Sequence, residues 1–585
     1  MPCEKKVSRA LIMASGMILL IVIIVTAVVC VRRSNGSSSA WENKVTSESL
    51  LGNYEQAAVA AMGEECAQIG ADILAKNGSA VDSAIASLLC EGVASLHSMG
   101  LGGGFFMMIW NATTKTAHYL DARETASRHA YPEMFKGNAT LSERGGLSVA
   151  IPGELLGYWE AHQRFGKLDW KELFQPAIDL CKKGSIINEY LESYMMSKEA
   201  VIKEEPTLAE ILINPATKNL YKVGDRIRRP RLAETLEKLS ASNGIGVQEF
   251  YNGSIARDLV REIKAFKGII DEIDFRNYKV EWQEPIKVKI ENMTMFAAPP
   301  PSSGTLLAFM MNVLKGFFSV KEEKIMYQRL VETFKWAYAK RTELGDPDFE
   351  LEVNDLVETL TSEIYADRIR NRIKDNWTSN DPKYYGAVTV NPDDSGTCHI
   401  CVLAPDGSAV SVTSTINQVF GASFRSESTG IIFNDEMDDF SAPDIINANG
   451  IPPSPVNFIK PGKRPLSSMV PTILVDENND VHLVIGGAGG PKITTAVALI
   501  MALNLWSGYD IKEAVDARRI HHQLYPMSIQ NEEGFPPSLL DFFHSVGHNS
   551  TAYKGLGSAV TAIVKQNGHI TANSDYRRYG KTAGF

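Results

Sequence analysis

The sequence predicts a mixed α/β (α+β) globular body that follows a single membrane-spanning helix. Amphipathic helical segments and short β-prone runs occur together over most of the 585-residue chain. An uncharged apolar run, Ala10–Val31, lies near the N-terminus. A hydrophobic content of 44% with 22% charged residues is ordinary for a protein with a large core.

The run Ala10–Val31 is long enough to cross a bilayer as a helix. It exceeds the apolar region of a signal peptide and ends in a poor cleavage site, so an anchor is favoured over a leader or a buried core helix. Basic residues flank both ends and do not set the orientation. We expect a cytosolic tail at 1–9, an anchor at 10–31 and a Ser-rich stalk at 32–56.

Glycosylation sequons indicate the orientation instead. Every N-x-[ST] match follows the apolar run, which favours a lumenal or extracellular body, hence a single-pass type II protein of the plasma membrane. The candidate asparagines are Asn35, Asn77, Asn111, Asn138, Asn252, Asn292, Asn376 and Asn549.

Charge and cysteine content exclude two classes of function. The net charge is −10, with acidic and basic residues interspersed, which argues against a nucleic-acid partner. No Cys or His cluster has the spacing of a zinc site. An oxidising compartment permits one or two disulfides among the cysteines after the anchor, and their spacing does not choose the pairs.

The first part of the body predicts helices at Glu64–Lys76 and at Ala80–Leu96, the second capped by Ser79. A Gly-rich turn, Ser98–Gly104, then leads into a strand at Phe105–Trp110. The turn lacks G-x-G-x-x-G spacing and precedes a strand, so close backbone packing is favoured over a phosphate site.

A second strand, Thr116–Leu120, ends at Asp121–Glu124, where Arg123 is either a solvated or salt-bridged residue or a fork for a substrate carboxylate. The chain then looks mostly helical up to about Lys374 and carries no catalytic constellation. Its clearest helices are Leu155–Phe165, Trp170–Lys183, Thr305–Phe317 and Lys324–Arg341.

The stretch Asp393–His399 begins a predicted hairpin. Thr397–Ala404 and Ser408–Asn417 flank Pro-Asp-Gly, which suits a three-residue loop closed by a left-handed Gly. If Ala404 pairs with Ser408, Thr397 lies opposite Thr415. A surface hairpin with a solvated Thr is one interpretation. The other makes Thr397 a nucleophile whose α-amine, freed by cutting Gly396–Thr397, acts as its base.

Three further motifs lie downstream. A short strand at Gly430–Phe433 precedes an acidic cluster, Asn434–Phe440, that suits a helix cap or an ammonium better than a metal. Ser467 and Ser468 precede a strand at Val470–Val475. A strand at Val481–Ile485 runs into Gly486–Gly490 and a helix at Lys492–Leu505. That Gly loop fails the P-loop pattern, and it offers either tight packing or oxyanion donors.

These candidates are chemically complementary. A Thr with a free α-amine supplies nucleophile and base, and a Gly-Gly turn supplies oxyanion donors. Arg and Ser side chains suit a carboxylate, whereas Asn and acidic side chains suit an ammonium. The set is typical of acyl transfer from a substrate with an α-amino acid head group.

From about Ala57 to Phe585 the sequence resembles the γ-glutamyltransferase (γ-glutamyl transpeptidase) family, in its membrane-anchored animal form. Six motifs carry the resemblance in order: Ser98–Gly104, Asp121–Glu124, Ser414–Asn417, Asn434–Phe440, Pro465–Met469 and Gly486–Gly490. The resemblance implies an N-terminal-nucleophile hydrolase fold, an αββα four-layer sandwich. It also implies autocleavage between Gly396 and Thr397 into a large subunit, 57–396, and a small subunit, 397–585, which stay together as a heterodimer.

The resemblance further implies residue roles. Thr397 would be the nucleophile, Thr415 its hydrogen-bond partner, and Gly489 and Gly490 the oxyanion hole. The γ-glutamyl α-carboxylate would be held by Arg123, Ser467 and Ser468, and the α-amino group by Asn417, Glu436 and Asp439. The γ-glutamyl group of glutathione or a similar donor would pass through a Thr397 ester to an amino acid, a dipeptide or water. No cofactor and no metal is expected, and Cys66 would pair with Cys90.

Two positions depart from the family pattern. Cys398 stands where a small residue such as Ala is common, which bears on cleavage, and Asp435 stands where a second Asn is common, which bears on pocket charge. Two alternatives are a related cephalosporin acylase and an inactive membrane-anchored receptor. The paired carboxylate- and ammonium-binding sets argue against the acylase, and the complete set of expected catalytic groups argues against the receptor.

Overall fold

The computed structural model describes residues 41–63, 65–317, 320, 322–389, 396–445, 452–553, 555 and 557–585. The predicted anchor Ala10–Val31 lies outside these residues. Within them, no helix combines the length and the apolar character needed to span a bilayer. The chain divides into a short unit, Met1–Lys44, and a body, Val45–Phe585, and only the body is described below.

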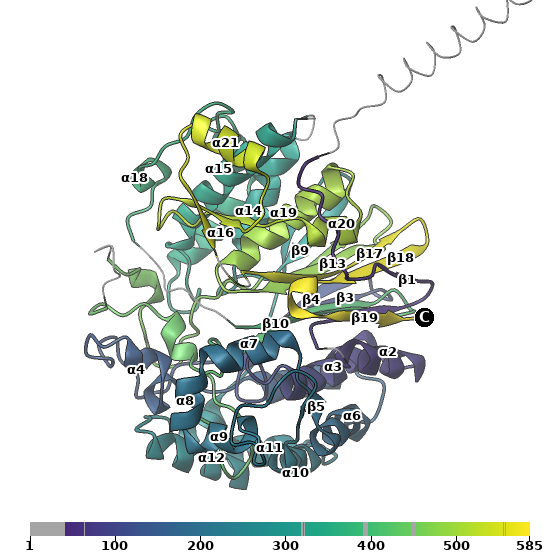
Figure 1. Ribbon diagram of the computed structural model, residues 1–585, viewed down its shortest axis with the longest axis vertical. Helices are drawn as coiled ribbons and strands as arrows, with labels where there is room; N and C mark the ends of the chain where they lie inside the picture. Colours follow the sequence, from purple (N-terminus) through teal and green to yellow (C-terminus); the bar gives the residue numbers. More distant parts are fainter. Residues whose placement is uncertain are drawn as a thin grey trace, which may run out of the picture. The chain divides into compact units, whose positions relative to one another are not determined.

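Two seven-stranded antiparallel sheets face each other at the centre of the body (Figure 1). The first has the order β1-β18-β17-β13-β12-β9-β8, with bounds Gly52–Tyr54, His569–Ser574, Ala559–Gln566, Val481–Ala488, Thr472–Val475, Met293–Ala297 and Ile286–Ile290. The second has the order β19-β2-β10-β11-β3-β4-β7, with bounds Lys581–Gly584, Ala58–Ala61, Cys398–Leu403, Ala409–Thr415, Gly104–Asn111, Thr116–Ala122 and Glu281–Gln283.

Helices cover the outer face of each sheet, so the predicted αββα sandwich is confirmed (Figure 1). Against or beyond the second sheet lie α2 (Cys66–Ala75), α3 (Ala80–Ala94), α5 (Glu154–Phe165), α6 (Trp170–Lys183), α10 (Pro230–Leu239), α11 (Ile245–Asn252) and α12 (Ser254–Ala265). The first sheet is covered by α14 (Gly304–Leu314), α15 (Glu323–Arg341), α16 (Glu352–Thr361), α17 (Glu363–Arg370), α19 (Lys492–Trp506), α20 (Ile511–Asp516) and α21 (Pro537–Ser545).

Shorter elements connect these layers. The helices are α4 (Thr140–Glu143), α7 (Glu189–Ser197), α8 (Glu199–Glu204), α9 (Pro206–Leu212), α13 (Glu272–Asn277) and α18 (Pro382–Tyr385). Two small sheets contain β5 (Ser185–Ile186) with β6 (Arg226–Ile227), and β14 (Ile520–His521) with β15 (Ile529–Glu532) and β16 (Ser550–Tyr553).

The β10–β11 hairpin has the predicted register. Cys398 pairs with Ser414 and Leu403 with Ala409, and Ala404 N–H donates to Ser408 O at 2.8 Å. Gly407 closes the turn at φ 83°. Both faces of the hairpin are buried, so the solvated-surface interpretation is wrong: the apolar face packs on the α3 side, and the hydroxyl-rich face meets the other sheet. There Ser411 Oγ donates to Ile485 O at 2.9 Å.

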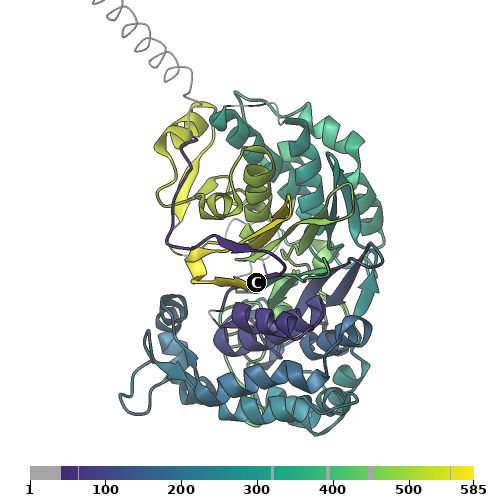
Figure 2. The ribbon, with the colours of Figure 1, turned by 90° about the vertical axis from the view of Figure 1, so that its right-hand side faces the viewer.

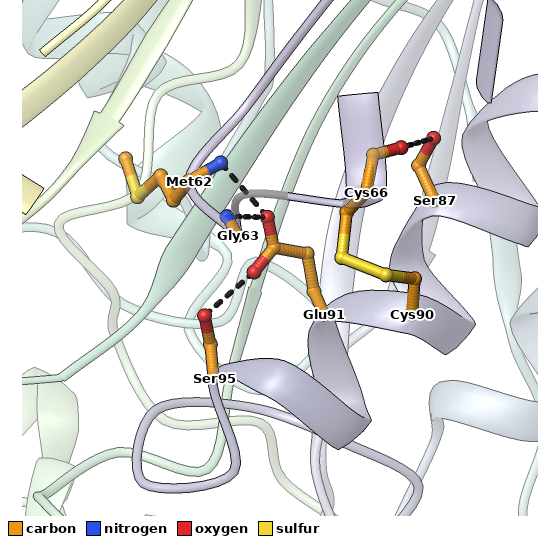
Figure 3. Close-up of a disulfide and its surroundings, with 7 residues drawn as sticks. All are labelled: Met62, Gly63, Cys66, Ser87, Cys90, Glu91 and Ser95. Carbon is orange, nitrogen blue, oxygen red and sulfur yellow. Dashed lines mark hydrogen bonds between the residues drawn. A yellow bond between two sulfur atoms is a disulfide. The ribbon is translucent and has the colours of Figure 1, made fainter. Parts of the chain in front are cut away.

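The disulfide implied for Cys66 and Cys90 is present and joins α2 to α3 (Figure 3). Beside it the buried Glu91 carboxylate accepts hydrogen bonds from Met62 N at 2.8 Å and Gly63 N at 2.5 Å. Helix α3 is Ala-rich and buried along almost its whole length, and Ser79 forms the predicted N-terminal cap in a capping box with Asp82. Together these contacts fix the turn that follows β2.

Three expectations are corrected. The body begins at Val45, not at Ala57. Ser47 Oγ donates a hydrogen bond to Asp516 Oδ1, and β1 pairs with β18 at the edge of the first sheet. The predicted strand Gly430–Phe433 is absent from the described residues, where Ile432 makes only an isolated bridge to Arg425. Strand β13 continues to Ala488, so Gly486 and Gly487 belong to the sheet and only the end of the Gly run forms a loop. Gly486 is tolerated in the strand because the His399 ring occupies the space of a side chain there.

The C-terminus lies among strands from the beginning of the chain (Figure 2). β19 pairs with β2, and Phe585 O accepts backbone hydrogen bonds from Gln56 at 2.8 Å and from Glu55 and Ala57 at 3.2 Å. The last residues of the chain are therefore part of the second sheet.

Gly103 marks the closest approach of backbones in this sheet. A Cβ at Gly103 would lie 1.9 Å from Thr415 O. We expect Gly103→Ala to force β3 and β11 apart and to lower stability by about 1–3 kcal/mol, the usual cost of overpacking. Thermal unfolding checks this. Gly92→Ala, where the nearest atom would be 3.3 Å away, is the matched control and should be nearly neutral. Equal melting temperatures for the two variants would contradict the argument.

Candidate active site

Thr397 lies immediately before β10, with the Gly396–Thr397 peptide intact and its N–H donating to Ser98 O at 3.3 Å. Its φ is 86°, which is unusual for a β-branched residue and marks a strained peptide. Gly396 has φ 134°, and a Cβ there would lie 2.0 Å from Asn417 O. Only glycine therefore fits the position before Thr397.

The hydroxyl of Thr397 is bonded to that of Thr415. Thr397 Oγ1 donates to Thr415 Oγ1 at 3.2 Å, and Thr415 Oγ1 also accepts Asn417 N–H at 2.8 Å. Both threonines are buried. The hairpin register thus places two predicted site residues in contact and fixes the backbone of a third.

The next link is the acidic turn. Asn417 Nδ2 donates to Asp435 O at 3.1 Å, and its Oδ1 is buried without a partner among the described residues. Asp435 precedes a 3₁₀ turn, Glu436–Asp439, whose first N–H donates to Asn434 Oδ1 at 3.0 Å. Asn434 also donates to Gly102 O at 2.6 Å, which ties the acidic turn to the Gly-rich turn before β3.

Arg123 follows β4 and points into the acidic turn. Its guanidinium forms ion pairs with Glu436 and Asp439. Glu124 Oε2 lies 3.8 Å from Arg123 Nη1. Arg123 Nε donates to Pro465 O at 3.3 Å, and Nη2 to Leu466 O at 3.4 Å. The prediction that Arg123 is salt-bridged is therefore confirmed, whereas the solvated interpretation is wrong, because the side chain is fully buried.

The two serines and the two glycines lie around the same segment. Ser467 follows the carbonyls that Arg123 contacts, and Ser303 Oγ donates to Ser467 O at 2.7 Å. Ser468 Oγ accepts from Arg341 Nη2 at 2.9 Å, and Ser468 O accepts from Thr494 Oγ1, in the first turn of α19, at 3.3 Å. Gly489 and Gly490 form the loop between β13 and α19.

Charge is unbalanced around Arg123. Burial alone would lower the pKa of Arg123, but the carboxylates of Glu436 and Asp439 raise it, so this guanidinium stays charged. Burial raises the pKa of Glu124 to about 7 and the pKa values of Asp435 and Glu436 well above their ordinary range. One guanidinium faces the carboxyl groups of Glu124, Glu436 and Asp439, more than it can neutralise, so this pocket favours a second cation.

Sequence reasoning missed several residues that hold this site. Asn457 accepts Leu466 N–H at 3.1 Å and donates to Asp439 O at 2.7 Å, joining the two sides of the pocket. Arg341 orients Ser468, and Arg578 contacts the carbonyls of Gly396 and Thr397. Asn457 and Arg341 lie outside the motifs, and the motif pattern gives no signal for Arg578.

The chain is similar to known proteins in both sequence and fold. The model of the family described as gamma-glutamyltranspeptidase matches residues 66–585. The chain belongs to this family. Membership of this family identifies the chain as an enzyme. The family resemblance predicted from the sequence is confirmed.

Individual relatives are similar to this chain over most of their length. Scoloptoxin SSD14 of Scolopendra dehaani is 44% identical over 93% of this chain and 95% of its own length. Glutathione hydrolase 5 proenzyme of Mus musculus is 36% identical over 91% of this chain and 93% of its own.

Solved structures support the fold. A cephalosporin acylase from Bacillus halodurans superposes with a TM-score of 0.79, covering 94% of this chain and 99% of that one, and its 22% identity supports the fold alone. A gamma-glutamyltranspeptidase from Pseudomonas nitroreducens gives a TM-score of 0.50 at 30% identity, over 55% of this chain and 95% of that one.

The acidic turn does not resemble a metal centre. Across the described part of this gamma-glutamyltranspeptidase, no group of His, Cys, Asp and Glu side chains has the arrangement of a metal site. Two of the acidic side chains in this turn, Glu436 and Asp439, are paired with Arg123.

The Thr397–Thr415 contact gives a direct test. We expect Thr415→Val to lower γ-glutamyl transfer by about tenfold to a hundredfold, the equivalent of about 1.5–3 kcal/mol for one hydrogen bond to a developing charge. Steady-state kinetics of the folded variant measure this. Thr415→Ser keeps the hydroxyl and should retain most activity, and equal loss in both variants would mean that loss of the hydroxyl is not what lowers the rate.

Proposed function

We propose that this chain is an extracellular γ-glutamyltransferase and glutathione hydrolase that matures by cutting its own Gly396–Thr397 bond. The observation that carries the proposal is a continuous set of contacts. It runs from the Thr397 hydroxyl through Thr415 and Asn417 to the acidic turn and Arg123. A nucleophile and a site for a zwitterion thus lie side by side.

The pocket charges match an α-amino acid head group. Arg123 pairs with Glu436 and Asp439. A γ-glutamyl head group carries one carboxylate and one ammonium. Its carboxylate would replace the acidic side chains on Arg123, with Ser467 and Ser468 as further donors. Its ammonium would form ion pairs with Glu436 and Asp439, with the unpartnered Oδ1 of Asn417 as a further acceptor.

The reaction would proceed in two acyl transfers. The α-amine of the cut Thr397 takes the proton of its own hydroxyl, and Oγ1 attacks the γ-carbonyl carbon. Gly489 and Gly490 N–H groups stabilise the oxyanion. The leaving amine departs with the proton, which leaves a γ-glutamyl ester on Thr397. An amino acid, a dipeptide or water then attacks the ester and restores the hydroxyl.

Location is part of the proposal. The apolar run Ala10–Val31 would anchor the chain as a type II protein, with the body outside the plasma membrane. The asparagines of the sequons at Asn77, Asn138, Asn252, Asn292, Asn376 and Asn549 are exposed, and Asn111 is partly exposed, which supports access for glycosylation. Peptide mapping of the glycans on the expressed protein tests the orientation.

Cleavage and turnover should depend on the same hydroxyl. We expect the wild-type protein to run as two chains on a denaturing gel, the smaller beginning at Thr397 by N-terminal sequencing. Thr397→Ala should remain a single chain and lose more than about a thousandfold in turnover. Thr397→Ser keeps a hydroxyl and should retain both reactions at lower rates. A fully active single chain would refute the proposal.

Donor binding should weaken in acid. The raised pKa values mean that carboxyl groups in the pocket are protonated at lower pH, and an ammonium must displace those protons. We expect KM for a γ-glutamyl anilide to rise by up to about tenfold per pH unit between pH 8 and 6. We measure KM because protonation of the Thr397 amine, the proposed base, would lower kcat in the same pH range.

A variant and an analogue serve as controls for this pH dependence. Glu124→Gln removes one titrating carboxyl and should flatten the KM profile. A glutaryl anilide has no ammonium, so rapid turnover of it would favour the acylase alternative. A KM that stays constant over this pH range in the wild-type enzyme would contradict the proposed ammonium site.

A further inference from the structure

Arg578 contacts the bond that the proposed cleavage would break. Its Nη2 donates to Gly396 O at 3.4 Å, and its Nη1 donates to Thr397 O. On the other side of the same peptide, Thr397 N–H donates to Ser98 O at 3.3 Å. Both the carbonyl and the leaving nitrogen of Gly396–Thr397 are thus held.

Arg578 is a buried cation that forms no ion pair with the residues the structure describes. It is 5% exposed, and among the described residues no carboxylate oxygen lies within ion-pair distance of it. Its remaining contacts are Met62 Sδ at 3.5 Å and the Tyr190 ring at 4.8 Å. Buried charges in proteins are normally paired, so this one has an unmet preference for negative charge.

The groups around Arg578 do not supply that charge. Two carboxylates act on Arg578 from beyond ion-pair distance, and both have other partners. Asp575 is paired with Arg519 and Arg577. The Glu91 carboxylate on α3 accepts from Met62 N, Gly63 N and Ser95 Oγ (Figure 3). His97 is neutral, because burial lowers its pKa to about 3. Burial also keeps Cys398 as a thiol by raising its pKa. The Tyr190 phenol is un-ionised for the same reason.

The chain holds Arg578 in place through its neighbours. It ends a 3₁₀ turn, Tyr576–Arg578, capped by Asp575, and the next residue, Tyr579, has φ 59°. Asp575 is paired with Arg519 at 2.9 Å and with Arg577 at 3.0 Å. The orientation of Arg578 is therefore fixed before any reaction, as electrostatic stabilisation requires.

We propose that Arg578 is a catalytic residue of the self-cleavage reaction, where it stabilises the oxyanion that forms on Gly396. This inference rests on the proposed autocleavage and identifies the side chain that stabilises its oxyanion. The negative charge appears only as the tetrahedral intermediate forms, so the ion pair that Arg578 lacks in the precursor is completed there.

The bonds change as follows. Thr397 Oγ1 bonds to the Gly396 carbonyl carbon, and the carbonyl electron pair moves to the oxygen beside Arg578. The hydroxyl proton leaves through Thr415 Oγ1, which already accepts it, and ends on the Thr397 nitrogen as the C–N bond breaks. The product is an ester with a free amine. Water adds to the ester carbon, and the C–O bond breaks as one water proton returns to Oγ1. Gly396 leaves as a carboxylic acid, which releases the other proton to solvent and becomes a carboxylate.

The test compares cleavage rates of the full chain in expressing cells. Pulse-labelled precursor is followed on denaturing gels for the wild type, Arg578→Met, Arg578→Lys and Arg229→Met. Arg229 is the matched control, since it is equally buried and likewise binds two backbone carbonyls, those of Gly92 at 2.8 Å and Gly430 at 2.7 Å, away from the cleavage bond.

Removal of one oxyanion donor lowers a rate by about a hundredfold to a thousandfold, and we expect that loss in folded Arg578→Met. Arg578→Lys keeps the charge and should lose less. Folded Arg229→Met should cleave at nearly the wild-type rate. Protease resistance identifies the folded fraction, and Arg578→Lys answers the question if Arg578→Met does not fold.

The outcomes separate the two proposals. Wild-type cleavage with Arg578 variants within about twofold of the wild-type rate would overturn the role of Arg578 and leave autocleavage standing. Equal slowing of the Arg229 and Arg578 variants would make the effect structural and also overturn it. A wild-type chain that stays intact would remove the proposed maturation itself.

Discussion

The register of the β10–β11 hairpin is the constraint on which the rest of the site depends. Because side chains alternate across a strand, one register places Thr415 beside Thr397, and a slip of one residue would exchange it for Ser414. The close approach of Gly103 to Thr415 O and the turn at Gly407 hold the pairing from both ends. Thr397, the proposed nucleophile, is therefore positioned by pairing in a buried sheet and not by a mobile loop.

The second constraint on the site is an imbalance between its buried positive and negative charges. Arg123 faces more carboxyl groups than it can neutralise, and burial leaves some of them protonated at neutral pH. Near the proposed cleavage bond the imbalance is reversed, because no carboxylate of the described residues forms an ion pair with Arg578. Each half of the site thus lacks the charge that its reaction would bring: an ammonium in one case, an oxyanion in the other.

The sequence predicted the parts of this site that rest on local patterns. Alternation and turn chemistry gave the hairpin register, and short motifs gave Arg123, the acidic turn and the serine pair. Long-range placement was not predictable from residue patterns: the second buried face of the hairpin, the continuation of β13 through two glycines, and the joining of residues 45–54 to the body all depend on packing partners far along the chain. Arg578 was missed because its role follows only from the return of the C-terminus to β2.

The strand order of the two sheets has a consequence for what happens after cutting. In the second sheet, strands from before and after Gly396 alternate, as β19, β2, β10 and β11, and β3 follow one another. In the first sheet, strands from before the cut lie at both edges of a central block from after it. Neither product can form a complete sheet alone. A cut molecule that unfolds would need two separate chains to find each other again, so its refolding would become concentration-dependent, and its working lifetime would be governed by the rate of unfolding instead of by an equilibrium.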